Sequence, residues 1–338
     1  MIILMEKLAV EKDINDVIAK IEELGFEAHP DKGEKQTVIG VVGSGKRDEL
    51  LNCIGAFSGV ENVVEITKPY KLVGKEFKSE PSIIDVDGVK VGGGNFAIMA
   101  GPCAIESKEQ LFEAARAVKE GGANILRGGA FKPRTSPYSF QGLMEEGLKM
   151  MAEAREETGL KIVTEVMDTR DVELVGRYAD ILQIGARNMQ NFALLKEVGQ
   201  SDVPVLLKRG SNATYKELLM AAEYIMAGGN YNVILCERGI RTFVSETRNT
   251  VDMSIVPVVR ELSHLPIIID PSHGTGKWKY VSPLAKAAIA IGADGLMVEV
   301  HPDPKNALCD GPQSLKPEKF KQMVNELKGI GEVVNRQF

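Results

Sequence analysis

The sequence lacks the features of membrane, disulfide-rich and nucleic-acid-binding proteins. No apolar run approaches the roughly 20 residues that a membrane helix needs, and the N-terminal segment MIILMEKLAV is too short for a signal peptide. The four cysteines, Cys53, Cys103, Cys236 and Cys309, form no CxxC pair, so we expect a reducing compartment rather than a disulfide scaffold. The net charge of −6 leaves no basic excess for nucleic-acid phosphates. We therefore expect a cytoplasmic protein with no membrane or nucleic-acid partner.

What is present is an ordinary globular composition in 338 residues, with 44% apolar and 26% charged residues. This length suggests about two domains. Residues 1–67 alternate short strand and helix patterns in the order βαββαβ, which is typical of a ferredoxin-like domain. The strand patterns cover 2–9, 26–29, 37–42 and 60–66, and the helix patterns cover 13–24 and 44–57. A polar segment, 68–82, is predicted to be a linker to a second domain at 83–338.

The second domain begins with Asp87-Gly88 between alternating apolar residues, which predicts a β-hairpin. Eight strand patterns follow, each leading to a helical stretch: 96–100, 123–127, 161–165, 180–184, 204–208, 232–236, 266–270 and 295–300. This regular alternation predicts a (β/α)8 barrel, with the hairpin closing its N-terminal end. An open doubly wound sheet is the alternative, although no GxGxxG follows the first strand. Thr214 with Glu217 and Ser282 with Pro283 are predicted helix starts.

Cationic side chains lie at or just after the ends of four of the expected strands, where a barrel of this kind places its chemistry. They are Arg127, Lys132, Arg134, Arg187, Lys208 and Arg238. Six cations around one mouth would repel one another unless anions lie between them, and Arg and Lys both suit phosphate and carboxylate groups. We therefore expect a substrate, or a pair of substrates, with more than one anionic group. The alternative is that each cation pairs with a carboxylate at the rim.

A second group could surround a divalent metal ion. It consists of Cys103 after the first strand, His273 after the seventh, Glu299 in the eighth and Asp310 in the loop that follows. The eighth strand neighbours both the seventh and the first in a closed barrel, so these residues are expected to meet. Sulfur, nitrogen and oxygen donors together fit Mn, Fe, Co or Zn and select none of them. The alternative for Cys103 is a packed, unreactive thiol.

Five motifs carry a family resemblance across about residues 82–330. They are Gly101-Pro102-Cys103, Lys132-Pro133-Arg134-Thr135-Ser136, Ile184-Gly185-Ala186-Arg187, Asp270-Pro271-Ser272-His273-Gly274-Thr275-Gly276 and Asp310-Gly311-Pro312-Gln313-Ser314-Leu315. In this order they resemble 3-deoxy-D-arabino-heptulosonate 7-phosphate (DAHP) synthase, in its short form with an N-terminal ferredoxin-like domain. The resemblance implies the condensation of phosphoenolpyruvate, erythrose 4-phosphate and water to DAHP and phosphate, the first step of the shikimate pathway.

The resemblance also implies roles for particular residues. One divalent metal ion would be bound by Cys103, His273, Glu299 and Asp310. Phosphoenolpyruvate would be bound by Arg127, Lys132, Ala186, Arg187, Lys208 and Arg238. Erythrose 4-phosphate would be bound by Pro133, Arg134, Thr135, Ser136 and Asp270. The residues implied in catalysis are Lys132, Cys103, His273 and Glu165.

Other functions remain open at this point. The sister enzyme that makes 3-deoxy-D-manno-octulosonate 8-phosphate from arabinose 5-phosphate shares the barrel and the metal set, but its counterpart of Lys-Pro-Arg-Thr-Ser is typically Lys-Ala-Asn-Arg-Ser. A Schiff-base aldolase using Lys208 and a non-enzymatic anion sensor are further alternatives. The small domain is expected to bind tyrosine or phenylalanine and to gate the barrel, or merely to aid assembly. The resemblance suggests a homotetramer.

Overall fold

The computed structural model describes residues 1–33, 36–64 and 68–338. The chain divides into two compact units. One comprises Met1–Pro81 with Glu261–His264, and the other comprises Ser82–Arg260 with Leu265–Phe338. Across the described ranges, no helix combines the length and the apolar character needed to cross a membrane.

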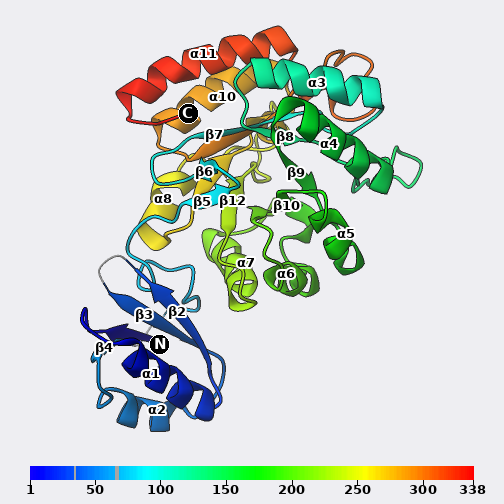
Figure 1. Cartoon of the computed structure of the whole chain (residues 1–338). Helices are drawn as coiled ribbons and strands as arrows, with labels where there is room; N and C mark the ends of the chain where they lie inside the picture. The colour runs from blue at the N-terminus through cyan, green and yellow to red at the C-terminus, as the bar shows by residue number, and fades with distance from the viewer. Residues whose placement is uncertain (34–35, 65–67) are drawn as a thin grey trace. The chain divides into compact units, whose positions relative to one another are not determined.

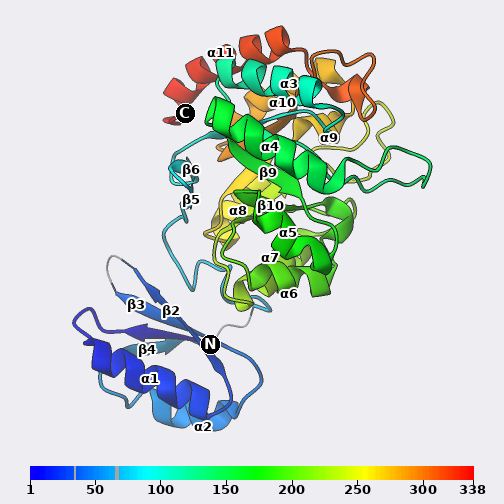
Figure 2. The same ribbon diagram turned by 45° about the vertical axis from the view of Figure 1, so that its right-hand side comes forward.

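The N-terminal unit is built on a four-stranded antiparallel sheet with the strand order β2-β3-β1-β4. Its elements are β1 (Ile2–Met5), α1 (Glu11–Glu23), β2 (Glu27–Lys32), β3 (Thr37–Val42), α2 (Arg47–Ile54) and β4 (Val60–Val64). Both helices cover one face of the sheet (Figure 2). Val17, Ile21 and Leu50 from the helices are buried there with Ile3 and Ile39 from the strands. The predicted ferredoxin-like order is confirmed, while residues 65 and 66 of the last predicted strand lie outside the described residues.

A β-hairpin, β5 (Ile84–Val86) and β6 (Val89–Val91), opens the second unit. Asp87 and Gly88 form its turn with φ angles of 47° and 93°, the left-handed conformations that a two-residue turn requires. Ile84, Val86 and Val91 are buried in one cluster with residues from all eight barrel strands, including Ala97 and Ile181 at strand starts. The hairpin therefore closes the N-terminal end of the barrel, as predicted.

Eight parallel strands form a closed barrel, which confirms the predicted fold over the open sheet (Figure 1). They are β7 (Ala97–Gly101), β8 (Ile125–Arg127), β9 (Lys161–Glu165), β10 (Ile181–Ile184), β11 (Val205–Lys208), β12 (Val233–Glu237), β13 (Ile267–Ile269) and β14 (Gly295–Glu299). The strands are buried almost throughout, because side chains fill the interior and helices cover the outside. β14 pairs with β7 and with β13, which brings the last two strand ends beside the first.

Helices surround the barrel (Figures 1 and 2). They are α3 (Lys108–Glu120), α4 (Met144–Thr158), α5 (Val172–Gly176), α6 (Phe192–Gly199), α7 (Tyr215–Ala227), α8 (Ile255–Leu262), α10 (Trp278–Ala290) and α11 (Pro317–Val333), with the short α9 (Pro271–Thr275) after β13. The Thr214 capping box is confirmed at the start of α7. The predicted helix start at Ser282 is wrong, because α10 begins one turn earlier and Pro283 lies inside it. Pro283 is the sixth residue of α10, beyond the first turn, and it has no backbone N–H to donate to the carbonyl one turn earlier.

Candidate active site

A cavity of about 520 Å³ lies at the C-terminal ends of the strands. All six predicted cations line it: Arg127, Lys132, Arg134, Arg187, Lys208 and Arg238. So do Pro133, Thr135, Ser136, Glu165, Ala186 and His273, together with Cys309 and Asp310. The strand ends therefore gather positive side chains around one hollow, which is suited to an anionic ligand.

The cavity also contains cations that the sequence analysis did not single out. Arg241 and Arg248 lie in the loop between β12 and α8, where Ile240 pairs with Thr250 in an isolated bridge. Both follow the end of β12 by several residues, so a search restricted to strand ends misses them. The sequence feature that could have indicated them is that Arg241 and Arg248 follow Arg238 within the same loop.

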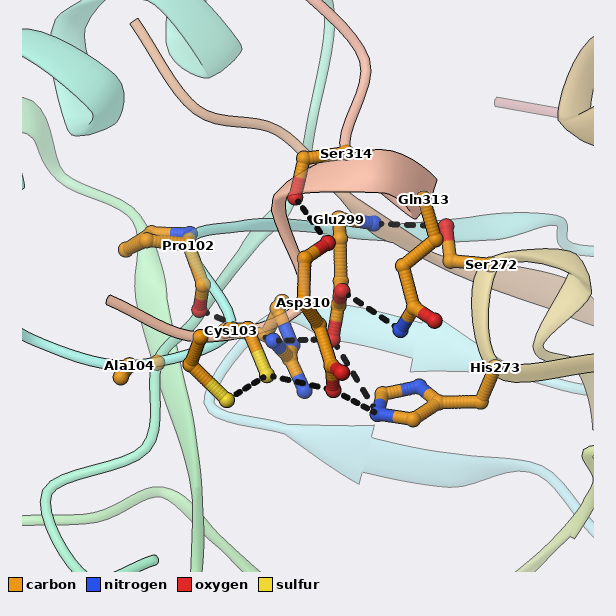
Figure 3. A network of polar contacts seen from close by, with 12 residues as sticks. Pro102, Cys103, Ala104, Ser272, His273, Glu299, Asp310, Gln313 and Ser314 are labelled. Atoms are coloured by element: carbon orange, nitrogen blue, oxygen red, sulfur yellow. Dashed lines mark hydrogen bonds and ion pairs between the residues drawn. The ribbon is translucent and has the colours of Figure 1, made fainter. Parts of the chain in front are cut away.

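Four side chains come together beside this cavity in the geometry of a metal centre (Figure 3). One potential ligand atom from each of Cys103, His273, Glu299 and Asp310 lies within 4.8 Å of the others. His273 Nε2 is 3.1 Å from Glu299 Oε1, and Cys103 Sγ is 3.3 Å from Asp310 Oδ2. A thiolate, an imidazole and two carboxylates are a chemically suitable donor set for a divalent transition metal. The structure thus brings together all four residues that were predicted to meet.

Asp270 sets the orientation of the His273 ring. Its Oδ1 accepts the backbone N–H of His273 at the start of α9, and its Oδ2 lies 2.7 Å from Nδ1 of the ring. Nε2 is therefore left facing the cluster. Asp270 Oδ2 also accepts a hydrogen bond from Lys208 Nζ at 2.6 Å. Burial works against ionisation, but His273 and Lys208 hold the pKa of Asp270 well below its usual range.

The structure gives Asp270 a different position from the one expected for a sugar-phosphate ligand. Its side chain is fully buried and is not part of the cavity lining. Both carboxylate oxygens are engaged by His273 and Lys208. Asp270 thus couples the candidate metal centre to the cationic group.

Two of the cations lie against the candidate metal ligands. Lys132 Nζ is 3.2 Å from Cys103 Sγ and donates to the Cys103 carbonyl at 2.9 Å. Although burial lowers it, the pKa of Lys132 stays above its usual value because Cys103 and Cys309 attract the charge. Arg127 donates to Glu299 Oε1 at 3.2 Å and to a backbone carbonyl, while its Nε is buried with no partner among the described residues.

Arg238 makes no ion pair or hydrogen bond within the part of the chain that the structure describes. Burial lowers its pKa, and Asp270 opposes that effect from nearby. An unpaired, largely buried guanidinium is costly unless a ligand anion meets it. The Arg238 guanidinium and the Arg127 Nε atom, which lack hydrogen-bond partners, are therefore the groups that most strongly indicate an anion-binding site.

The segment Lys132–Ser136 is held by contacts with other strand ends. Arg187 donates to the Pro133 carbonyl at 2.6 Å and approaches Thr135 Oγ1 at 3.4 Å. Arg134 NH1 lies 2.7 Å from Cys309 Sγ, which in turn is 3.3 Å from Cys103 Sγ. Glu165 accepts from Gln183 at 3.3 Å and faces the cavity.

Comparisons with known proteins agree with this geometry. The model of the DAHP synthetase I family matches residues 73–335, and the model of the DAHP synthase ferredoxin-like domain matches residues 1–68. A phospho-2-dehydro-3-deoxyheptonate aldolase from Thermotoga maritima is 50% identical, over 99% of this chain and 98% of that protein. A 2-dehydro-3-deoxyphosphooctonate aldolase from Syntrophotalea carbinolica is 34% identical, over 75% of this chain and 98% of that protein.

Solved structures show the same relationship. The crystal structure of the Thermotoga maritima heptonate aldolase matches with a TM-score of 0.79 at 48% identity, covering 99% of this chain and 98% of that one. A truncated form of 3-deoxy-D-arabino-heptulosonate 7-phosphate synthase from the same organism matches with a TM-score of 0.74 at 49% identity. The truncated form covers 79% of this chain and 98% of its own.

Proposed function

This chain belongs to the DAHP synthetase I family, and from that membership we propose how its residues carry out the reaction. It is a DAHP synthase, a transferase that forms a carbon–carbon bond between phosphoenolpyruvate and erythrose 4-phosphate in the shikimate pathway. The octulosonate alternative is not favoured, because the two octulosonate aldolases compared are 34% and 32% identical over 75% and 74% of this chain, whereas the heptonate aldolase is 50% identical over 99% of it.

Phosphoenolpyruvate would bind among Arg127, Lys132, Ala186, Arg187, Lys208 and Arg238. The observation that carries this assignment is the unpaired Arg238 guanidinium, together with the Arg127 Nε atom that has no hydrogen-bond partner, in a cavity that adjoins the four candidate metal ligands. The carboxylate and the phosphate of this substrate would supply the missing partners. Fixing both ends of the molecule places its C3 carbon toward the aldehyde, which is catalysis by positioning.

Cys103, His273, Glu299 and Asp310 would hold one divalent metal ion, and their mixed donor set fits such an ion. Such an ion supplies Lewis-acid polarisation of the aldehyde oxygen when bound. Asp270 would keep Nδ1 of His273 protonated, so that Nε2 stays available as a ligand.

The remaining roles concern protons and the second substrate. Lys132 is held in its charged form, and we assign it the transfer of a proton to the oxygen that becomes an alkoxide. Glu165, at the end of β9, would orient the water that adds to C2 of phosphoenolpyruvate. Pro133, Arg134, Thr135 and Ser136 would bind the phosphate of erythrose 4-phosphate, and Thr135 and Ser136 are exposed at the cavity mouth.

We also propose a regulatory role for residues 1–67, joined by the linker 68–82 to the catalytic barrel 83–338. In this proposal the small domain binds tyrosine or phenylalanine, and the enzyme acts as a homotetramer in the cytoplasm. The match to the DAHP synthase ferredoxin-like domain model supports this role, and among the described residues of that domain no group of His, Cys, Asp and Glu side chains is arranged to hold a metal ion.

The test is phosphate release from phosphoenolpyruvate with erythrose 4-phosphate and, separately, with arabinose 5-phosphate. The metal-free enzyme and the enzyme resupplied with Mn²⁺ are compared. We expect turnover only with metal, and faster turnover with the four-carbon aldose. Preference for the five-carbon aldose would overturn the substrate assignment. Inactivation of the metal-free enzyme by borohydride with substrate would instead indicate a Schiff base on Lys208.

A further inference from the structure

Hydrogen bonds join two of the candidate metal ligands, Asp310 and Glu299, through Arg248 and Gln313. Arg248 NH1 donates to Asp310 Oδ1 at 3.3 Å and to Gln313 Oε1 at 3.1 Å. Gln313 Nε2 then donates to Glu299 Oε2 at 2.8 Å (Figure 3). Neither Arg248 nor Gln313 contributes an atom to the group of four ligands.

The two oxygens of the Glu299 carboxylate have different partners. Oε1 faces the cluster, 3.1 Å from His273 Nε2 and 3.2 Å from Arg127 NH1. Oε2 is held by Gln313, and the Glu299 backbone N–H donates to Ser272 Oγ at 3.0 Å. Gln313 therefore occupies Oε2 of this fully buried carboxylate and leaves Oε1, which Arg127 also contacts, as the oxygen that faces the candidate metal centre.

Asp310 shows the same division. Its Oδ2 faces Cys103 Sγ at 3.3 Å and His273 Nε2 at 3.9 Å, while its Oδ1 is bound by Arg248. Each acidic ligand thus has one oxygen turned toward the cluster and one occupied by the Arg248–Gln313 pair.

The orientation of the Gln313 amide follows from its two neighbours. A carboxylate offers only acceptors, and a guanidinium offers only donors. The amide nitrogen must therefore face Glu299 and the amide oxygen must face Arg248. The reverse orientation would lose both hydrogen bonds.

Local backbone structure fixes the place of Gln313. It ends the 3-10 helix η3 (Gly311–Gln313), and its N–H bonds to the Asp310 carbonyl at 3.1 Å. Two residues later, the Leu315 N–H bonds to the Glu299 carbonyl at 2.8 Å. The turn between Asp310 and Leu315 is thereby anchored to the end of β14, and the Gln313 side chain is 2% exposed.

We propose that Gln313 and Arg248 are positioning residues that pre-organise Glu299 and Asp310 for the divalent metal. This inference rests on the proposed metal site. Hydrogen-bond partners that orient metal ligands typically change metal affinity by roughly 10–100-fold when removed. The same effect is expected here, without loss of any ligand atom.

The experiment uses Gln313→Met, which keeps the side-chain length but removes both polar atoms. Arg248→Met interrupts the same chain from a partly exposed position, with 41% of the Arg248 side chain accessible. Gln322→Met is the matched control, since Gln322 Nε2 also donates to a carboxylate, Glu326 Oε1 at 3.0 Å, on the exposed face of α11. Each full-length, metal-free variant is titrated with Co²⁺ alone, by calorimetry and by the absorbance of the cobalt–thiolate bond to Cys103.

We expect the Kd for Co²⁺ to rise about 10–100-fold in Gln313→Met and in Arg248→Met, and to stay within about twofold in Gln322→Met. Because the pair acts as one chain, the double variant should bind Co²⁺ about as weakly as Gln313→Met alone. In Gln313→Met, saturating Co²⁺ should restore most of kcat and leave the KM for phosphoenolpyruvate unchanged.

A Kd for Gln313→Met within about twofold of the unsubstituted protein would overturn the inference. Additive losses in the double variant would refute the coupling between Arg248 and Gln313. Should Gln313→Met fail to fold, an unchanged Kd in Arg248→Met would refute the proposal, and a weakened one would support it. Failure of the unsubstituted protein to bind Co²⁺ would instead reject the metal site itself.

Discussion

Arg209→Met tests whether a buried ion pair holds the loop that carries three cavity arginines. Arg209 follows β11 and donates to Glu237 Oε2 at 2.8 Å and to Asp252 Oδ2 at 3.0 Å. Glu237 is fully buried, and its other oxygen accepts the Gly239 N–H at 2.6 Å. The loop from Arg238 onward therefore starts from a carboxylate whose charge is balanced by Arg209.

The expected cost follows from this burial. Removing one partner of a buried ion pair leaves an uncompensated charge and costs about 3–5 kcal/mol. Burial already raises the pKa of Glu237, and Arg209 opposes that rise. With an m-value of about 3 kcal/mol/M, the urea midpoint should fall by about 1.0–1.7 M. Adding Glu237→Gln to Arg209→Met should recover most of the lost stability, because the buried carboxylate that has lost its partner is then replaced by a neutral amide.

The assay is urea unfolding followed by circular dichroism, paired with phosphate-release kinetics. The control is Arg170→Met, which removes an exposed pair with Asp168 and should cost at most about 1 kcal/mol. In Arg209→Met, the KM for phosphoenolpyruvate should rise as Arg238 loses its fixed position. An Arg209→Met cost as small as that of the control would refute the reasoning.

Three further predictions follow from the structure. Arg238→Met removes a cation that makes no ion pair with the residues that the structure describes. The substitution should raise the KM for phosphoenolpyruvate at least tenfold and leave the urea midpoint nearly unchanged. A large loss of stability would show that Arg238 has a structural role instead. Cys103→Ser should abolish the cobalt–thiolate absorbance and most turnover, whereas Cys236→Ser, which removes a buried thiol that is not one of the four candidate ligands, should retain the absorbance. Burial lowers the pKa of His264 to about 4 in the folded protein. As the pH drops from about 6.5 to 4, His264 therefore takes up a proton in the unfolded protein but not in the folded one, and the free energy of unfolding should fall. His264→Gln should flatten that slope, and an unchanged slope would rule His264 out as its source.

Most of the architecture was predictable because its signals are local. Strand and helix patterns alternate regularly from Phe96, and glycines such as Gly159 and Gly292, with φ angles of 68° and 92°, mark helix ends. Once the strands close into a barrel, β14 must lie between β13 and β7, so the candidate metal ligands on these strand ends must meet. The start of α10 was predicted wrongly because Ser282-Pro283 matches a common pattern of helix starts. In the structure, a helical turn already precedes this pair.

The contacts around the ligands were not predictable in the same way. Asp270 was expected to face substrate, yet it is buried between His273 and Lys208, and only three-dimensional packing determines that choice. Arg248 lies in a long irregular loop with no periodic pattern to place it. Gln313 depends on a single turn of 3-10 helix, whose direction no side-chain spacing reveals.

The β5–β6 hairpin closes the N-terminal end of the barrel, and this has a consequence for access to the cavity. Substrates and products must all enter and leave through the opening at the C-terminal ends of the strands. Arg127 and Lys208 are each 4% exposed, whereas Thr135 and Ser136 are exposed at the mouth of the cavity. If the two substrates bind at the residues proposed above, phosphoenolpyruvate would bind before erythrose 4-phosphate, because an aldose phosphate already bound at the mouth would obstruct the way to Arg127 and Lys208.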